Sequence, residues 1–404
     1  MVSRRSFLQS SAAAVSLFGA SRLTNAWAAN APGVTDAEIK IGQTMPYSGP
    51  ASAYGTIGRA TIAYFKIINE AGGINGRNIN LISLDDGYSP PKTVEQTRRL
   101  IEQERVAFVF GSVGTPTNSA ILSYLNDNKV PQLFIASGGS MFADPKHFPW
   151  TMIGGFNYQT EAHIFAKHIL ATRPDAKIGL LYQNDGYGKD YLVGLHDTLG
   201  SAHARMIIKE VSYEVTEPVV ESQIVTLQGA GVDTLIIAAT SKAAAQAIRK
   251  SYDIGWEPLR YLNTPASSIA ATLKPAGLEK SKGLISSSYS KDPSDPRWKD
   301  DPGYREWVAF VTKSMMPADL IDFWAVYGWN IARMLVQVLK QCGDDLSREN
   351  IMRQAGNLKD LELPMLLPGI TINTSPENNV PIRQLQLVRF TGVHWELFDE
   401  VMTE

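Results

Sequence analysis

Apolar positions recur along this chain with two different periods. Residues 39–42 alternate apolar and other side chains, as a short strand does, and a loop rich in Ser, Gly and Pro follows. Residues 56–71 carry small and apolar side chains at helical spacing, and a pair of glycines ends this stretch. Residues 79–84 are again largely apolar. The segment 39–86 therefore predicts a strand, a loop, a helix and a second strand.

The same order of elements continues to the end of the chain. The run 106–110 is apolar throughout, as expected of a strand in a parallel sheet that helices cover on both faces. A hairpin about Thr391 and Gly392 closes the chain. Strands that alternate with helices in this way predict an α/β fold built on parallel sheets. Further strands are predicted at residues 130–136, 177–182, 206–211, 234–239 and 284–288, and helices at 159–172, 298–315 and 320–342.

The first residues predict an export signal. Arg4 and Arg5 form a twin-arginine motif, and the apolar run that follows is too short for a stable membrane span. Ala26 and Ala28 then supply the small-x-small pattern of a cleavage site. Residues 1–28 are therefore expected to be a twin-arginine signal peptide whose removal leaves a soluble periplasmic protein. A retained interfacial helix is the alternative.

Composition narrows the class of protein further. Without the three arginines of the export signal, 35 basic residues face 40 acidic ones, a net charge of −5. This charge argues against nucleic acid or an anionic membrane as partner. About 375 residues remain, too many for one hydrophobic core and suited to two domains. Cys342 is the one cysteine of the sequence, so no disulfide can form within the chain.

The amino-acid sequence of the first strand–helix–strand segment resembles that of a known family. Residues 48–50 read SGP, Tyr54 and Gly55 follow, residues 68–77 read INEAGGINGR, and the second strand ends in Asp85 and Asp86. This run resembles the amino-terminal signature of periplasmic solute-binding proteins of the leucine/isoleucine/valine-binding type. The resemblance implies two Rossmann-like lobes with parallel sheets, joined by three crossover strands, with a ligand cleft between them.

The resemblance also places the connections between the lobes. They are expected near Phe156, near Tyr289 and at residues 373–383. The resemblance covers nearly all of the chain after the export signal, weakens across residues 250–300 and is loose again in the last thirty residues. The first lobe is then expected at residues 36–156 and 289–373, and the second at 157–288 and 374–404.

Catalytic chemistry is not indicated. His163 and His168 lie five residues apart, so a helix would not bring them to one face as a zinc pair requires. The sequence has neither a Gly-x-Ser-x-Gly elbow nor a Walker loop. Asp85 and Asp86 could form an acid/base pair, but a carboxylate pair that bonds the loops at the end of a strand is favoured. We therefore predict no catalytic residue, no metal site and no cofactor.

Two loops at neighbouring strand ends suggest an anion site instead. Thr115 is predicted as the N-cap of a helix with Pro116 at its first position, and the first N–H groups of such a helix attract an anion. Gly138 and Ser140 belong to a second loop whose backbone N–H groups could converge on the same anion. Each loop alone is compatible with ordinary capping and turn chemistry. The resemblance implies that Thr115, Gly138 and Ser140 hold a ligand carboxylate.

The second half of the predicted site departs from the family pattern. The resemblance implies that Tyr54 covers the ligand side chain and that Tyr187 closes over it. Amino-acid binders of the family pair the ligand ammonium with an acid, because a buried cation without a partner is costly. The matching segment 261–267, which contains Thr264, has no acidic residue, and Thr240 or Ser241 replaces a family aromatic. Thr240 and Thr264 are expected to contact the ligand at these positions.

These observations predict the periplasmic substrate-binding subunit of an ABC importer. The ligand is expected to be a small organic acid, aromatic acids included, that bears a carboxylate and no α-ammonium group. Asp185 or Glu161 could instead supply the missing acid, in which case a branched-chain amino acid would bind. The expected partners are the ligand and a membrane permease, and the protein is expected to be a monomer. A ligand sensor of the same fold is a further alternative.

Overall fold

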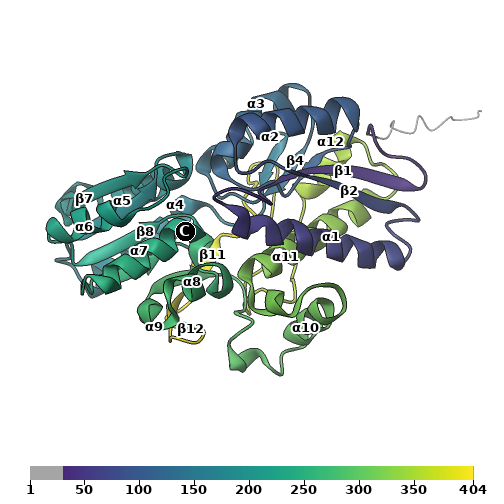
Figure 1. Ribbon diagram of the computed structural model, residues 1–404. Coiled ribbons are helices and arrows are strands. Elements are labelled where there is room, and N and C mark those ends of the chain that lie inside the picture. Colours follow the sequence, from purple (N-terminus) through teal and green to yellow (C-terminus); the bar gives the residue numbers. More distant parts are fainter. Residues whose placement is uncertain (1–30, 404) are drawn as a thin grey trace, which may run out of the picture.

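The computed structural model describes residues 31–403 and shows two α/β lobes side by side (Figure 1). The predicted signal peptide at residues 1–28 lies outside the described residues. None of the helices in residues 31–403 combines the length and the apolar run needed to cross a bilayer.

The first lobe is built on a five-stranded sheet in the order β2-β1-β3-β4-β5, and all of its pairs are parallel. Its strands are β1 (Glu38–Met45), β2 (Asn78–Asp85), β3 (Val109–Phe110), β4 (Gln132–Ile135) and β5 (Thr151–Ile153). Helices α2 and α3 lie on one side of this sheet, and α1 and α11 on the other (Figure 1). The helices of this lobe are α1 (Gly55–Glu70), α2 (Pro90–Arg98), α3 (Thr115–Asp127), α10 (Pro302–Ser314), α11 (Phe323–Cys342) and α12 (Arg348–Ala355).

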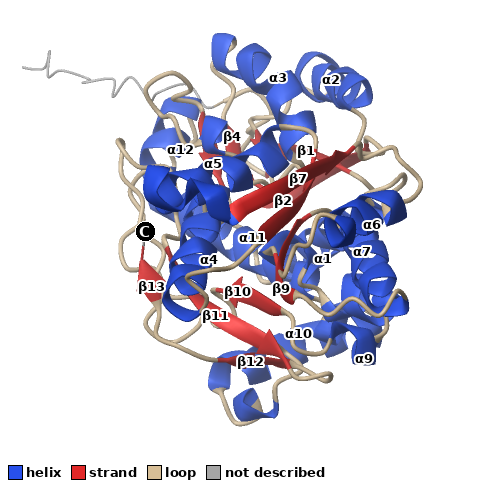
Figure 2. Ribbon diagram, turned by 90° about the vertical axis from the view of Figure 1, so that its left-hand side faces the viewer, coloured by secondary structure: helices blue, strands red, loops and turns tan. Residues whose placement is uncertain are grey.

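The second lobe is built on an eight-stranded sheet in the order β12-β11-β10-β9-β8-β6-β7, with β13 beside β11. The pairs from β7 to β10 are parallel, whereas β11 pairs antiparallel with β10, β12 and β13. Figure 2 shows β10, β11 and β12 side by side, which confirms the predicted closing hairpin. The strands are β6 (Ile178–Gln183), β7 (Ile207–Tyr213), β8 (Thr234–Ala238), β9 (Leu259–Leu262), β10 (Ile285–Ser288), β11 (Gln384–Phe390), β12 (Trp395–Leu397) and β13 (Met402–Thr403).

The helices of the second lobe follow its parallel strands, as right-handed crossover connections require. Asn157 caps α4 and Asp185 caps α5, each by accepting a hydrogen bond from a backbone N–H of the first turn. These helices are α4 (Tyr158–Thr172), α5 (Gly186–His203), α6 (Glu221–Gly229), α7 (Ser241–Asp253), α8 (Lys274–Ala276) and α9 (Leu278–Ser281).

Three segments connect the lobes, and they run next to one another. The backbone N–H of Ile382 donates to the carbonyl of Gly155 at 3.3 Å. This bond joins the first connection, near Phe156, to the third, at residues 373–383. The N–H of Leu367 donates to the carbonyl of Tyr289 at 2.9 Å, which ties the second connection to the first lobe. The predicted two-lobed α/β fold is therefore confirmed, while the residue limits of the lobes stay a prediction.

The apolar interior explains why these elements form. Residues 106–110 are fully buried, as predicted for a central strand, although only Val109 and Phe110 pair regularly. The largest apolar cluster contains Phe110 of the first sheet and Tyr261 of the second, so it passes through the junction of the lobes. This junction also contains the candidate site.

Candidate functional site

Two adjoining pockets lie between the lobes, and we call them the first and second cleft pockets. Each has an empty volume of about 350 Å³, part of which is open to solvent, so the site suits a small molecule. The first is lined by Tyr54, Ile57, Tyr88, Val113, Gly114, Thr115, Ala136, Tyr158, Tyr187, Thr240, Pro265 and Trp324. The second is lined by Ala136, Ser137, Gly138, Gly155, Phe156, Tyr158, Thr264, Pro265, Tyr289, Phe323, Trp324 and Tyr327.

The structure brings six of the seven predicted site residues to these pockets. Tyr54, Thr115, Tyr187 and Thr240 line the first cleft pocket, and Gly138 and Thr264 line the second. The seventh, Ser140, lines neither pocket, because its backbone N–H and its hydroxyl both bond to Asp190 of helix α5.

Two helices, one from each lobe, begin at the first cleft pocket. Helix α3 begins at Thr115, and its N-cap is Gly114 rather than the predicted Thr115. The chain turns one residue earlier than expected because Gly114 adopts φ +103°, a conformation that glycine takes readily. Helix α7 begins at Ser241, with Thr240 as its N-cap. The first N–H groups of both helices lack intrahelical acceptors and carry partial positive charge, so an anion between them is stabilised from both lobes.

Tyr54 links the lobes at this point. Its hydroxyl accepts a hydrogen bond from the N–H of Ser241 at 3.0 Å and donates to the carbonyl of Pro265 at 3.0 Å. Its ring contacts the indole of Trp324 edge to face, with centroids 4.8 Å apart. Burial raises the pKa of Tyr54 to about 12, so the phenol stays neutral and keeps its proton for Pro265.

Aromatic rings make up much of the cleft wall. The ring of Tyr158 lies against Tyr187 with centroids 5.0 Å apart and is stacked on Tyr191 at 5.6 Å. Burial raises the pKa of Tyr158 as well.

Several of these aromatic residues were not predicted from the sequence. Tyr88 could have been found from its place just after the carboxyl end of β2. Trp324, which lines both pockets, has no comparable signal.

No Asp, Glu, Lys, Arg or His is among the residues that line the two cleft pockets. Glu161 is fully buried beside them, but Thr264 donates to it from its backbone N–H at 3.0 Å and from its hydroxyl at 2.6 Å. Ser287 and Tyr191 donate to the same carboxylate at 2.6 and 2.5 Å. Burial raises the pKa of Glu161. Its lone pairs are therefore taken up within the second lobe.

Asp185 is the other acid that could have served a ligand ammonium. It lines neither cleft pocket, and its Oδ1 accepts the N–H of Tyr187 at 2.9 Å as the cap of α5. Gln183 donates to its Oδ2 at 2.5 Å. Burial raises the pKa of Asp185.

Asp85 and Asp86 bond the loops after β1 and β2. Asp85 accepts the N–H and the hydroxyl of Ser48 at 3.1 and 2.6 Å. Asp86 accepts the N–H of Tyr88 and the hydroxyl of Thr93, each at 2.9 Å. These contacts match the loop-bonding interpretation of the pair.

Comparison with known proteins agrees with the fold. The family described as "Periplasmic binding protein" matches residues 38–393, and the chain therefore belongs to this family of non-enzymatic solute-binding proteins. Leu/Ile/Val-binding protein homolog 3 of Brucella melitensis is 27% identical over 228 residues, which are 55% of this chain and 60% of that protein. Homolog 1 of Brucella abortus is 24% identical over 330 residues, 80% of this chain and 84% of that protein. The chain is thus a periplasmic binding protein that is similar to Leu/Ile/Val-binding proteins.

Solved structures share the two-lobed fold. A branched chain amino acid ABC transporter protein of Thermus thermophilus with bound valine superposes with a TM-score of 0.81 at 15% identity, covering 92% of this chain and 98% of that one. A fatty acid ABC transporter substrate-binding protein of Thermomonospora curvata gives a TM-score of 0.77 at 21% identity, covering 93% and 95%. At these identities the likeness shows the fold alone.

Proposed function

We propose that this protein is the periplasmic substrate-binding subunit of an ABC importer and that its solute is a small organic acid without an α-ammonium group. One observation carries the ligand class. The first cleft pocket lies between the starts of two helices, α3 and α7, yet no acidic side chain lines it. Such a pocket favours a carboxylate and offers no partner for an ammonium group.

The rings around the pocket suggest the rest of the ligand. Tyr158 and Trp324 line both cleft pockets, and Phe156 and Phe323 extend the apolar wall in the second. Aromatic walls of this kind bury a flat apolar body well. An aromatic carboxylic acid would place its carboxylate at the helix starts and its ring along this wall.

A branched-chain amino acid is the second candidate, because relatives of this chain are named Leu/Ile/Val-binding proteins. Its ammonium group would need Glu161 or Asp185. Both carboxylates already accept several hydrogen bonds and would have to release some of them. This cost disfavours the amino acid relative to the matched acid.

A titration series tests the ligand class. The purified protein is titrated calorimetrically with 3-phenylpropanoate and phenylalanine, and with 4-methylpentanoate and leucine, since each pair differs only in the ammonium group. We expect each acid to bind at least tenfold more tightly than its amino acid. The neutral 3-phenylpropanamide should bind weakly. Tighter binding of leucine than of 4-methylpentanoate would overturn the organic-acid proposal.

Thr115 provides the matched variant. Its side chain lines the first cleft pocket, with its hydroxyl 2.7 Å from that of Ser137. Hydrogen bonds to a charged group contribute about 1.5–3 kcal/mol, so Thr115→Ala should weaken binding of the acid more than tenfold. The exposed Thr226, changed to Ala, should leave the affinity unchanged.

The cellular part of the proposal rests on the sequence and the family. A twin-arginine signal would export the protein to the periplasm, where it would work as a monomer with a membrane permease. Replacing Arg4 and Arg5 by Lys should leave the protein in the cytoplasm in a fractionation experiment. Normal periplasmic amounts of that variant would argue for another export route.

A further inference from the structure

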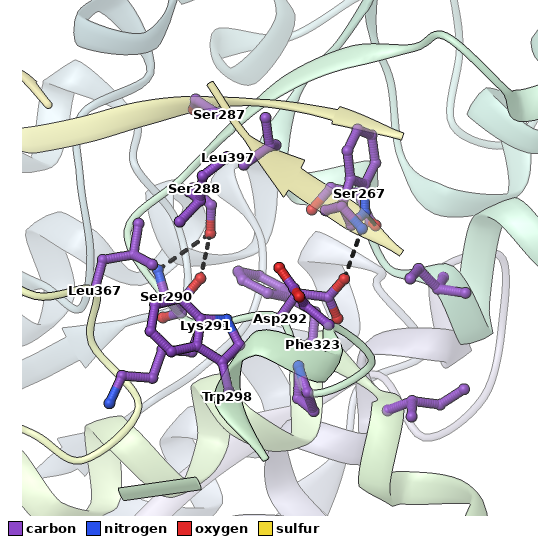
Figure 3. A pocket seen from close by; sticks show the side chains of 16 residues that line it. Ser267, Ser287, Ser288, Ser290, Lys291, Asp292, Trp298, Phe323, Leu367 and Leu397 are labelled. Atoms are coloured by element: carbon purple, nitrogen blue, oxygen red, sulfur yellow. Dashed lines mark hydrogen bonds between the residues drawn. The ribbon is translucent and has the colours of Figure 1, made fainter. Parts of the chain in front are cut away.

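A third pocket, which we call the flank pocket, lies beside the cleft and has an empty volume of about 500 Å³, part of it open to solvent (Figure 3). Of its lining residues, Phe323 alone also lines a cleft pocket. Ser267 and Trp395 come from the second lobe, Phe323 from helix α11 of the first, and Asp292 from the connection that follows β10. A molecule in the flank pocket would therefore contact both lobes.

Two of the three charged side chains that line the flank pocket have a partner of opposite charge. The ammonium of Lys291 donates to Asp301 at 2.6 Å and to the carbonyl of Pro364 at 2.8 Å. The Oδ2 atom of Asp295 lies 2.6 Å from the Nε atom of Arg297. Only the third charged side chain of the pocket therefore lacks a partner of opposite charge.

That third side chain is Asp292, and only neutral groups bond to it. Its oxygens accept the N–H of Ser294 at 2.9 Å and the N–H of Trp395 at 2.8 Å, the second of which is drawn in Figure 3. No Lys, Arg or His of residues 31–403 forms an ion pair with Asp292. Burial and the nearby Asp295 raise the pKa of Asp292, as expected of a carboxylate that lacks a cation.

Aromatic side chains surround this carboxylate. Trp298, Trp395 and Phe323 all line the flank pocket together with Asp292, and Figure 3 labels Trp298, Phe323 and Asp292 in it. The ammonium of Lys291 already lies 5.5 Å from the ring centroid of Trp298, so this ring accepts cations. A carboxylate without a counter-ion among aromatic rings is the chemistry that recognises an organic ammonium ion.

We propose that the flank pocket is a second binding site, for a small organic cation whose ammonium group pairs with Asp292 and whose apolar body packs against Trp298 and Phe323. The site is separate from the solute cleft and does not depend on the proposed solute. Because both lobes line it, a bound cation favours the arrangement in which the lobes touch.

Calorimetric titration of the full protein with benzylamine and benzyl alcohol tests the site, because the two probes have the same shape and only the amine is charged. We expect benzylamine to bind at least tenfold more tightly. Asp292→Asn should remove this preference and leave the binding of benzyl alcohol as it was. The matched control is Asp300→Asn, since the side chain of Asp300 is 88% exposed and lies outside the pocket.

Three results would overturn the proposal: equal binding of both probes to the unaltered protein, unchanged benzylamine binding in Asp292→Asn, or loss of benzylamine binding in Thr115→Ala. If Asp292→Asn does not fold, Ile321→Trp takes its place. Ile321 lines the flank pocket and is only partly buried, so the larger side chain fills the pocket without disturbing the core. Benzylamine that still binds Ile321→Trp with full affinity would equally exclude the site.

Discussion

The carboxylate of Asp190 accepts two hydrogen bonds from Ser140, one from the backbone N–H at 2.7 Å and one from the hydroxyl at 2.6 Å. Ser140 follows β4 in the first lobe, and Asp190 lies on α5 in the second. Gln159 donates to the same carboxylate at 2.9 Å. This contact joins the lobes across the cleft, so Ser140, which was expected to hold a ligand, holds the opposite lobe instead.

Asp190→Asn should therefore weaken solute binding by about three- to tenfold, because it turns bonds to a charged group into neutral ones. If Ser140 held the ligand carboxylate directly, Asp190→Asn would change little, and Ser140→Ala alone would weaken binding. Calorimetry on both variants separates these two roles of Ser140. Asp197, which is exposed on the same helix, provides the control when changed to Asn.

Tyr54→Phe should weaken solute binding by at least about fivefold. The substitution removes the hydroxyl that bonds to Ser241 and Pro265 in the opposite lobe, and each lost hydrogen bond costs about 0.5–1.5 kcal/mol. The ring remains to pack against Trp324. Tyr252→Phe, on the exposed side of α7, is the control. Unaltered affinity in Tyr54→Phe would show that the hydrogen bonds of this hydroxyl to the opposite lobe do not contribute to solute binding.

Elements with a long periodic pattern of their own could be predicted from the sequence. The helix expected at residues 56–71 is found as α1, Gly55–Glu70, because its apolar face recurs over four turns. Strands β5 and β9 were missed, since three or four residues are too few to show a period. The longer periodic elements were thus enough to predict the fold class, and the short strands only complete its sheets.

The candidate site could be predicted only in part. Thr115 and Gly138 were found because carboxyl ends of neighbouring parallel strands meet at one edge of a sheet. The partnership of Ser140 with Asp190 was not, because it links residues 50 positions apart on different lobes. Trp324 was missed because its contact with Tyr54 joins positions far apart in the sequence. A sequence pattern reports which positions are buried, but not which surfaces face each other across a cleft.

Gly138→Ala should lower both the melting temperature and the affinity for the solute. A Cβ atom at Gly138 would lie 2.3 Å from the carbonyl oxygen of Phe156 and 2.9 Å from the ring of Tyr158. The backbone of the first lobe connection would have to move, at a cost of about 1–3 kcal/mol. Gly229→Ala is the matched control, because no atom lies within 4 Å of its added Cβ. Equal melting temperatures for the two variants would contradict this prediction.

Asp85 should stabilise the protein in a pH-dependent way. Burial opposes its charged form, but hydrogen bonds from Ser48, Gly87 and Lys92 outweigh this and lower the pKa of Asp85 from 3.8 to about 2. A carboxyl whose folded pKa is lowered adds stability above the unfolded pKa, and that stability is lost as the pH falls through the folded pKa.

Asp85→Asn removes this titration. Thermal melts from pH 6 to pH 2 should show a constant deficit of the variant above about pH 4, which shrinks towards pH 2. The deficit should be small, since the side chain of Asp85 is 34% exposed and solvent screens its contacts. The exposed Asp175, changed to Asn, serves as control. A deficit that stays constant or grows towards pH 2 would show that Asp85 does not stabilise the loop through its charge.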